Sequence, residues 1–483
     1  MSIAKLPSAG FSITVRLALS ADAGAIGRLT TAVGESGANV TALDVVSSDH
    51  RRVVVDLTCD TADATHAKRV TGVLAEMPGV KVRKVSDRTF LLHLGGKIEV
   101  TPKVSLRNRD ELSMAYTPGV ARVCQAIAEN PDDARRLTIK RNTVAVVTDG
   151  TAVLGLGNLG PEAALPVMEG KAALFKKFAG VDAWPVCLDT QDTDEIVDIV
   201  TAIAPAYGGI NLEDIAAPRC FEIEARLRKR LNIPVFHDDQ HGTAIVVLAA
   251  LRNALRVVGK RLEDVRVTVS GAGAAGTAIM NLLVKAGAGD IIACDRSGAL
   301  HRGMDGLSPA WRELTECTNK SNVTGTLAEA VAGSDVFIGV SAPNILTGAD
   351  VAKMAKDPVV FALANPDPEI DPREAAEHAA IVATGRSDQP NQINNVLAFP
   401  GVFRGMLDAQ ATGWSDEAAL AAADAIASVV GEDKINPSFI VPSVFDPHVA
   451  PAVAQAVKEV LKPEPNGNGD PIRGLERVSL GHE

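Results

Sequence analysis

The amino-acid sequence predicts an α/β protein with three parts: a ferredoxin-like βαββαβ unit, an α/β middle domain and a Rossmann-like domain. Three observations support this prediction. Strand and helix patterns alternate over residues 10–86, bounded apolar runs recur after residue 106, and a glycine-rich turn joins a strand to a helix near residue 271. A chain of 483 residues is long enough for two or three domains with large cores.

The first unit comprises residues 10–86. Its expected strands cover residues 11–19, 40–46, 52–59 and 80–85, and its expected helices cover residues 24–36 and 63–77. This βαββαβ order is ferredoxin-like. Together with the loop at residues 20–24, it resembles an ACT domain, a module that commonly binds an amino acid or pairs with a second copy. A dimerisation module that binds no ligand is the alternative.

The rest of the chain divides at changes of pattern. We expect a connector at residues 87–105, an α/β domain at 106–258 that ends in a helix over 241–258, and the Rossmann-like domain at 259–440. Within the latter, apolar runs at 335–340 and 359–364 are typical of buried parallel strands. Helical patterns cover 416–430 and 448–461, the second within a C-terminal segment at 441–462. The tail, residues 463–483, is rich in Pro, Gly, Asn and charge, which predicts disorder.

Composition excludes several classes of partner. The net charge of −11 argues against nucleic acid or an anionic membrane as the main partner, and 4% aromatic residues leave few stacking platforms for bases. No apolar run approaches about 18 residues, and the first residues lack the apolar region of a signal peptide. The six cysteines form no C-x-x-C pair, which favours a reducing cytoplasm.

Two stretches have the spacing G-x-G-x-x-G, at residues 155–160 and 271–276. The second follows a strand pattern at 265–270, opens a helix at 277–286 and precedes a strand at 291–294 that ends at Asp295. This order predicts a dinucleotide site, because the glycines allow a pyrophosphate onto the helix N-terminus while an acid about 20 residues further on binds the ribose. The cofactor-binding residues are Gly271, Ala272, Gly273, Ala274, Ala275, Gly276, Asp295 and Arg296.

The first stretch has a different context. It follows a strand pattern at 143–148, but Asp149-Gly150-Thr151 and Val153-Leu154 intervene, which suggests a hairpin. We interpret it as a close-packed loop on the substrate or phosphate side. For the cofactor itself, Asp295 opposes a 2′-phosphate and favours NAD, whereas Arg296 could accept that phosphate and keeps NADP open.

Three carboxylates are candidate metal ligands. Glu213 and Asp214 follow one apolar run and Asp239 follows another, which predicts positions at the carboxyl ends of strands, where open α/β sheets bind ligands. Three hard oxygen ligands suit Mg²⁺ or Mn²⁺. A solvated acidic loop is the alternative. His237 and His241 are interpreted as structural, because their spacing lacks the glutamate of a metalloprotease motif.

Two further residues are candidates for proton transfer. Tyr116 is one of only two tyrosines and precedes a Thr-Pro-Gly turn. Lys171 follows a glycine near the start of a helix, beside apolar residues. Burial next to a metal there is expected to depress the pKa of Lys171.

At this point the sequence resembles the short bacterial malic enzymes, over roughly residues 100–445. The matching segments, in the family's order, are residues 116–119, 155–160, 169–172, 211–214, 237–243, 271–276, 364–368 and 394–401. The resemblance implies a malic-type catalytic domain followed by the Rossmann domain, with the ACT-like unit as a regulatory addition. It also implies at least a homodimer.

The family's roles carry over to matching positions. The resemblance implies Tyr116 as general acid and Lys171 as general base, with Asp238 as the partner of Lys171. It further implies that the divalent metal is bound by Glu213, Asp214 and Asp239. Asn365 and the Asn394-Asn395 pair become contacts to substrate or nicotinamide. Larger family members carry an arginine for a malate carboxylate where residues 151–153 here read Thr-Ala-Val, so the residue that binds this carboxylate is left open.

The implied activity is metal-dependent oxidative decarboxylation of (S)-malate to pyruvate and CO₂ with reduction of NAD or NADP. Regulation by an amino acid is a further expectation. A malolactic enzyme shares nearly all these residues and is an alternative, as is a related hydroxy-acid oxidative decarboxylase. A non-catalytic amino-acid sensor is a further alternative, which the presence of Tyr116, Lys171 and the three carboxylates disfavours.

Overall fold

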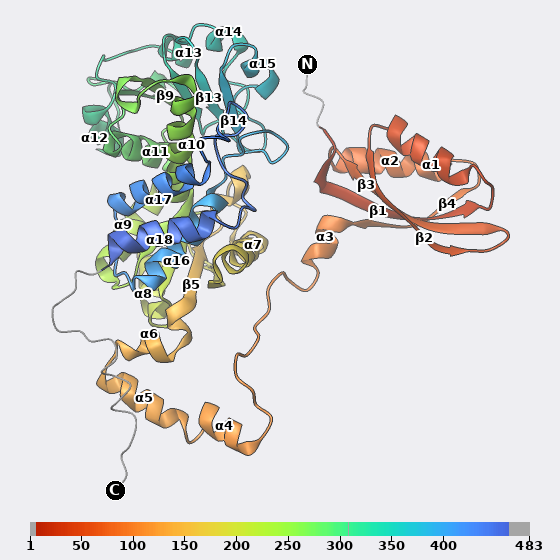
Figure 1. Cartoon of the computed structure of the whole chain (residues 1–483), viewed down its shortest axis with the longest axis horizontal. Coiled ribbons are helices and arrows are strands. Elements are labelled where there is room, and N and C mark those ends of the chain that lie inside the picture. Colours follow the sequence, from red (N-terminus) through yellow and green to blue (C-terminus); the bar gives the residue numbers. More distant parts are fainter. Residues whose placement is uncertain (1–5, 308, 463–483) are drawn as a thin grey trace. The chain divides into compact units, whose positions relative to one another are not determined.

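The computed structural model describes residues 6–307 and 309–462. The chain forms two compact units, and the boundary between them along the sequence falls after residue 101 (Figure 1). Each unit is described by itself. The predicted disordered tail at 463–483 lies outside the described residues.

The smaller unit has the βαββαβ order that the sequence predicts. Its antiparallel sheet has the strand order β2-β3-β1-β4. Alternate residues of β1 and β3, such as Val15 and Leu57, form a core with one face of each helix, where Leu29 and Leu74 lie. The elements are β1 (Ser8–Ser20), α1 (Ala25–Glu35), β2 (Asn39–Ser48), β3 (Arg52–Thr61), α2 (Ala64–Glu76) and β4 (Val80–Asp87). A short helix, α3 (Arg88–His93), follows.

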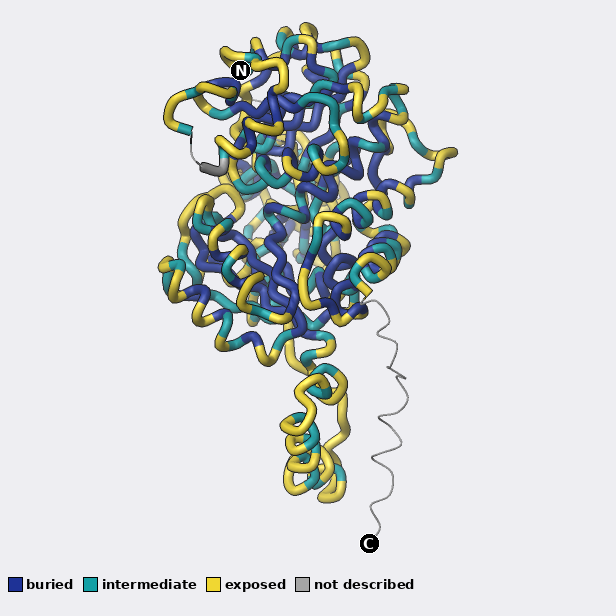
Figure 2. Tube along the Cα trace, turned by 90° about the vertical axis from the view of Figure 1, so that its left-hand side faces the viewer, coloured by how far each residue is buried: buried dark blue, intermediate teal, exposed yellow. Residues whose placement is uncertain are grey.

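The larger unit begins with an arm, which we define as residues 106–137. It carries α4 (Arg109–Ala115), α5 (Val120–Glu129) and α6 (Asp133–Leu137), and none of these three helices has a buried residue. In Figure 2 this segment is an extension of exposed chain that protrudes from the body of the larger unit. A 3₁₀ turn, η1 (Ile139–Asn142), joins the arm to the first strand of the body.

The catalytic half of the body is built on a parallel sheet with the order β6-β5-β7-β8. Because the strands are parallel, their carboxyl ends meet at one edge. The strands are β5 (Thr143–Thr148), β6 (Asp182–Cys187), β7 (Gly209–Leu212) and β8 (Val235–His237). The helices and turns are η2 (Val153–Gly155), α7 (Pro161–Ala179), α8 (Thr193–Ile203), η3 (Ala204–Ala206), α9 (Arg219–Arg230), the π turn η4 (Asp238–Gly242) and α10 (Thr243–Val258).

The combined helix Asp238–Val258 is long and apolar enough to cross a membrane by length and composition, but two thirds of its apolar window is buried inside the protein. Eleven residues of α10 are buried, and ten of them belong to the core that both halves share. It is therefore a core helix, and its apolar composition reflects burial on several sides.

The second half is a Rossmann-like domain, as predicted. Its sheet has the order β11-β10-β9-β12-β13-β14, with every pair parallel except β10 and β11. The strands are β9 (Arg266–Ser270), β10 (Asp290–Asp295), β11 (Gly298–Ala299), β12 (Val336–Gly339), β13 (Val359–Ala362) and β14 (Ile381–Thr384). The helices and turns are η5 (Leu262–Asp264), α11 (Ala274–Lys285), α12 (Pro309–Cys317), α13 (Leu327–Val331), α14 (Gly348–Val351), α15 (Pro372–Ala376) and η6 (Asn395–Leu397).

Three C-terminal helices return to the catalytic half: α16 (Phe399–Asp408), α17 (Asp416–Val429) and α18 (Val449–Leu461). Helix α16 packs on α7, and α17 packs on α10. Phe399 and Phe403 of α16 make edge contacts with Phe175 of α7, at ring-centroid distances of 4.7 and 5.2 Å. These contacts fix the two halves against each other around α7, the helix that carries Lys171.

Candidate active site

Lys171 is a cation on the apolar face of α7. The helix begins at Pro161, after Gly160 with φ +85°, and ends at Gly180 in the left-handed conformation. Lys171 is only 7% exposed. Its Nζ lies 2.5 Å from Asp238 Oδ2, 2.9 Å from Glu213 Oε1 and 4.3 Å from the centroid of the Phe399 ring. The burial of this charge is thus compensated by two carboxylates and an aromatic face.

The carboxylates around Lys171 come from two neighbouring strands. Glu213 and Asp214 follow β7, and Asp238 and Asp239 follow β8, so all four lie at the carboxyl edge of the sheet. Asp214 has φ +54°, which is strained for a residue other than glycine. Its backbone N–H donates to Asp239 Oδ2 at 2.9 Å. This contact joins the two strand ends and holds the turn.

Glu213, Asp214 and Asp239 form one cluster. Each offers an oxygen, and these atoms lie within 4.8 Å of one another. Asp214 Oδ2 is buried and has no hydrogen-bond partner among the described residues. Burial and the neighbouring carboxylates raise the pKa of Asp214 to about 8, and burial above all raises the pKa of Glu213. A divalent cation with hard oxygen ligands, Mg²⁺ or Mn²⁺, fits this set.

The pKa of Lys171 is shifted in the opposite direction from the one that the sequence suggested. Burial lowers it, but the charges of Asp238 and Glu213 outweigh burial and raise the pKa above the usual value for lysine. The prediction considered burial beside a metal and not the two carboxylates. In this arrangement the ammonium form is favoured.

Asp238 is completely buried and holds Lys171 in position. Its Oδ2 also accepts a hydrogen bond from Asn395 Nδ2, which comes from the Rossmann half. Burial raises the pKa of Asp238 to about 7. Asn394 is engaged locally, because its side chain accepts from Val396 N at 3.0 Å. Of the predicted asparagine pair, therefore, Asn395 contacts the lysine site and Asn394 caps η6.

A buried ion pair supports the turn that carries Asp214. Arg219 Nη2 lies 2.8 Å from Asp149 Oδ2, and Asp149 is 1% exposed. Thr151 Oγ1 donates to Asp149 Oδ1 at 2.6 Å and accepts from Ala216 N at 2.9 Å. Ala152 N donates to Asp214 O at 2.9 Å. The Thr-Ala-Val segment at residues 151–153 thus has a structural role here.

Sequence reasoning missed Asp149 and Arg219. The position of Asp149 directly after a strand was a usable signal, whereas nothing in the sequence around Arg219 indicates its partner.

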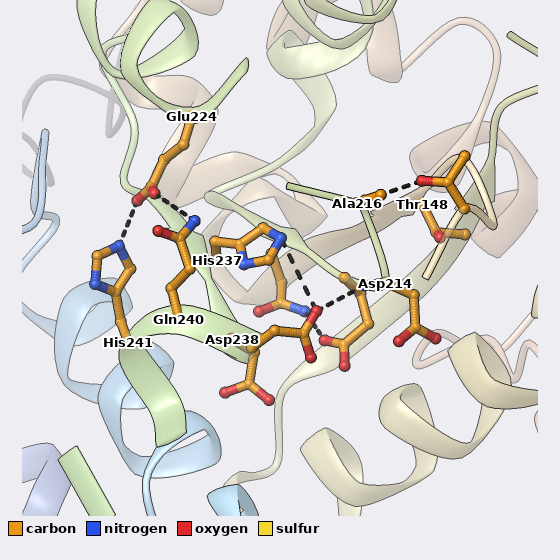
Figure 3. A network of polar contacts seen from close by, with 12 residues as sticks. Thr148, Asp214, Ala216, Glu224, His237, Asp238, Gln240 and His241 are labelled. Carbon is orange, nitrogen blue, oxygen red and sulfur yellow. Dashed lines mark hydrogen bonds and ion pairs between the residues drawn. The ribbon is translucent and has the colours of Figure 1, made fainter. Parts of the chain in front are cut away.

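A second polar network lies behind the carboxylates, as Figure 3 shows. Glu224 of α9 is bonded to His241 Nε2 at 2.7 Å and accepts from Gln240 Nε2 at 3.2 Å. His237 is fully buried, and burial lowers its pKa to about 4, so its ring is neutral. Its Nε2 lies 3.9 Å from Asp239 Oδ2. These contacts support η4 and agree with the structural interpretation of both histidines.

The second glycine-rich stretch forms the turn between β9 and α11. A Cβ on Gly276 would lie 1.7 Å from Gly271 O, and one on Gly271 would lie 2.8 Å from Val340 O, so packing requires both glycines. A Cβ on Gly273 would meet no atom within 4 Å. Protein packing therefore does not explain that glycine, whose position leaves open space at the N-terminus of α11. Ala272, Ala274 and Ala275 complete the turn.

Asp295 lies at the carboxyl end of β10, beside the strand that precedes this turn. Its Oδ1 accepts from Ser297 N at 2.8 Å and from Ser297 Oγ at 2.6 Å, which fixes the carboxylate. Arg296 is exposed. A fixed negative charge at this strand end opposes a 2′-phosphate.

The first glycine-rich stretch is a closed loop that contains the 3₁₀ turn η2, and not a hairpin of two strands. A Cβ on Gly150 would lie 2.2 Å from Gly160 O, so the two ends of the loop pack closely. The loop between them is not close-packed as predicted, because Leu156 is 69% exposed and a Cβ on Gly157 would meet no atom within 4 Å. A Cβ on Gly155 would lie 3.3 Å from the carbonyl oxygen of Asn365, which follows β13. Loops from the two halves therefore meet at Gly155 and Asn365.

Tyr116 lies on the arm, directly after α4, and it is 66% exposed. Helices α4 and α5 lie apart from α7 and β5 in Figure 1. Within one chain the fold brings together Lys171, Asp238, Asn395 and the three-carboxylate cluster, but it does not bring Tyr116 to them.

A Rossmann-like domain joined to an α/β domain with a buried lysine and a carboxylate cluster defines a class of dinucleotide-binding α/β proteins. Two family models identify it more closely. "Malic enzyme, N-terminal domain" matches residues 95–228, and "Malic enzyme, NAD binding domain" matches residues 240–462. The chain belongs to the malic enzyme family.

Relatives and solved structures agree. A "NAD-dependent malic enzyme" of Geobacillus stearothermophilus is 57% identical over 451 residues, which cover 93% of this chain and 94% of the relative. A "Bifunctional malic/malolactic enzyme" of Bacillus subtilis is 56% identical over 379 residues, 77% of this chain and 92% of the relative. The crystal structure of a NAD-dependent malic enzyme from Thermotoga maritima has a TM-score of 0.74 and 48% identity, covering 77% of this chain and 99% of that one.

Proposed function

We propose that this protein catalyses the oxidative decarboxylation of (S)-malate to pyruvate and CO₂ with reduction of NAD, in the presence of a divalent cation. The observation that carries the proposal is the buried Lys171, held between Asp238 and Glu213 beside the three-carboxylate cluster. The close relatives named as NAD-dependent and bifunctional malic enzymes support the same reaction.

Glu213, Asp214 and Asp239 are the residues that would hold Mg²⁺ or Mn²⁺. Their clustered oxygens and the unpartnered Asp214 Oδ2 support this assignment. Bound there, a divalent cation supplies a Lewis acid for the C2 oxygen of malate and a positive charge that opposes the raised pKa of Lys171.

The protein's own groups would move the protons. Lys171 Nζ, in its neutral form beside the cation, would accept the proton of the C2 hydroxyl, and a bound nicotinamide would supply the acceptor for the C2 hydride. Asp238 orients Lys171 and is itself held by Asn395. Tyr116 donates the proton that C3 receives after CO₂ has left. We further assign Asn365, Asn394 and Asn395 to contacts with substrate or nicotinamide.

We assign the cofactor to the turn at residues 271–276, with its pyrophosphate at the N-terminus of α11. The open space at Gly273 supports this site. The carboxylate of Asp295, fixed by Ser297, favours NAD over NADP.

Tyr116 can serve this chemistry if the protein is at least a homodimer. The arm carries exposed apolar side chains, including Leu112 at 51%, Met114 at 71% and Tyr116 at 66% exposure. Exposed apolar side chains that gather on one segment favour a protein partner. We propose that the arm packs on a second copy and delivers Tyr116 to that copy's site, and that the assembly works in the cytoplasm.

The smaller unit is proposed to be an ACT-like regulatory domain. Its βαββαβ order and the strand order β2-β3-β1-β4 support the assignment. An amino acid is the expected effector. If malate turnover stays constant across a panel of amino acids, the unit is a dimerisation module that binds no effector.

A malolactic activity is the second candidate, because the Bacillus subtilis relative is named for both reactions. The malic and malolactic reactions differ in whether the reduced cofactor is released from the protein. Release of NADH with pyruvate marks the malic reaction, whereas lactate without net NADH marks the malolactic one.

The test follows NADH and NADPH formation from malate with Mn²⁺, in the wild type and in Lys171→Ala. We expect NADH formation by the wild type and a loss of at least about a thousandfold in the variant, because proton removal and lysine positioning are lost together. Lys171→Ala with wild-type turnover would exclude the proposed base.

A further inference from the structure

A cavity of about 250 Å³ lies at the base of the arm, in the larger unit. Four of its lining side chains are cations, Arg135, Lys140, Arg141 and Lys458, and one is a carboxylate, Asp408. We name it the basic cavity. Such a concentration of positive charge stands out in a chain with a net charge of −11.

The protein neutralises only part of the positive charge of the basic cavity, through Asp408 in its lining and Asp132 near Arg135. Among the described residues, none of the four cations forms an ion pair with a carboxylate. Asp408 is engaged elsewhere, because its Oδ1 accepts from Arg404 Nε at 3.0 Å and from Arg404 Nη2 at 2.7 Å. A bound anion would complete the charge balance of the cavity.

Two of the cations are held in position by backbone carbonyls. Lys140 Nζ donates to the carbonyls of Ala204 at 3.3 Å and Pro205 at 2.9 Å, and Arg135 Nη2 donates to that of Asn232 at 3.3 Å. Both side chains are partly buried. Burial, and then the charge of Arg135, lower the pKa of Lys140. The cavity therefore presents fixed cations that repel each other, an arrangement that an anion relieves.

The basic cavity is distinct from the active site. Its residues on α6 and η1 precede Thr143, the first residue of β5, whereas the catalytic carboxylates follow the opposite, carboxyl ends of the strands. The six residues of β5 span about 20 Å at about 3.3 Å per residue. The remaining lining residues come from α16, from the turn after it and from α18.

We propose that the basic cavity binds a small multivalent anion of the phosphate class, with a diphosphate as the best match to four cations. The volume is below that of pockets for drug-sized ligands and the lining is mainly polar. An anion there links α6 and η1, at the base of the arm, to α16 and α18. An effect of this anion on malate turnover rests on the proposed function and the proposed role of the arm. Binding of the anion to the cavity does not.

The test titrates inorganic pyrophosphate, and separately ADP, into the full-length protein by calorimetry. Saturating NAD keeps both probes from the dinucleotide turn. The variant is Arg141→Ala with Lys458→Ala, since neither side chain has a described ion pair. The control is Arg136→Ala, on the same helix as Arg135 but outside the cavity and paired with Asp133 at 3.0 Å.

We expect one diphosphate per chain and an affinity that falls about tenfold for each cation removed, hence about a hundredfold in the double variant. The control should bind like the wild type. The ratio of ADP to pyrophosphate affinity then identifies a nucleotide or a free diphosphate as the source.

Absence of binding in the wild type, unchanged binding in the double variant, or an equal loss in the control would overturn the proposal. So would dissociation of the double variant into smaller species in sedimentation, because a second copy would then fill the cavity. Without added anion the double variant should turn over malate like the wild type. A lack of malate activity in every sample would count against the proposed function and leave the binding result intact.

Discussion

Arg219→Ala removes one side of a buried ion pair next to the candidate metal ligands. Asp149 is 1% exposed, and Arg219 is its described ionic partner at 2.8 Å. Breaking a buried pair by removing one partner costs about 3–5 kcal/mol, which we reduce to about 2–3 kcal/mol because the Arg219 side chain is 28% exposed. The variant should therefore be clearly less stable.

This loss corresponds to a measurable shift in Tm. The unfolding entropy is about 2.1 cal/mol/K per residue, or about 0.8 kcal/mol/K for the larger unit of residues 102–483, so Tm should fall by about 2.5–4 °C. The control is Arg226→Ala on the same helix, whose Asp194 partner is 77% exposed. Removing an exposed pair costs less than about 1 kcal/mol, which is a shift of about 1 °C or less.

The same change should weaken metal binding. Arg219 holds Asp149 and Thr151, and their segment is hydrogen-bonded to the backbone of Asp214 and Ala216. Loss of an outer partner typically weakens metal binding by about 10–100-fold. Mn²⁺ binding measured by electron paramagnetic resonance on the folded variant should show this loss. Equal Tm values for the two variants, or unchanged Mn²⁺ affinity in Arg219→Ala, would refute the reasoning.

Three further predictions test other parts of the account. Gly276→Ala should lose NAD binding, measured by calorimetry, because its Cβ would lie 1.7 Å from Gly271 O; normal affinity would show that the turn tolerates a side chain. Asp295→Ser should raise the ratio of NADP to NAD turnover, and an unchanged ratio would remove Asp295 from cofactor choice. At pH 8, iodoacetamide should modify exposed Cys317 and spare Cys59, since burial raises the pKa of Cys59 to about 11; mass spectrometry of the labelled peptides decides this.

Local patterns were sufficient to predict the elements that carry the site. The apolar runs before Glu213 and before Asp239 are strands, and because these strands are parallel neighbours their carboxyl ends bring the acids together. The order of strand, glycine turn, helix and strand likewise predicted the Rossmann-like half. In both cases the information lies within about 40 residues of sequence, where periodicity is informative.

The missed features depend on contacts between distant residues. Asn395 and Asp238 are 157 positions apart, and Arg219 and Asp149 are 70 apart, so no local pattern indicates either pair. The pKa of Lys171 depends on two such contacts, which raise it without a metal, whereas the sequence indicated a lowered pKa beside one. The position of Tyr116 on an exposed arm depends on what the arm packs against, which one chain's sequence does not specify.

The central claim is most directly tested by the stoichiometry of the wild-type reaction with (S)-malate, NAD and Mn²⁺. NADH, pyruvate and CO₂ are measured in the same sample, with lactate as a fourth product. The account predicts equal amounts of the first three and no lactate. Formation of lactate without free NADH, or no consumption of malate, would contradict it.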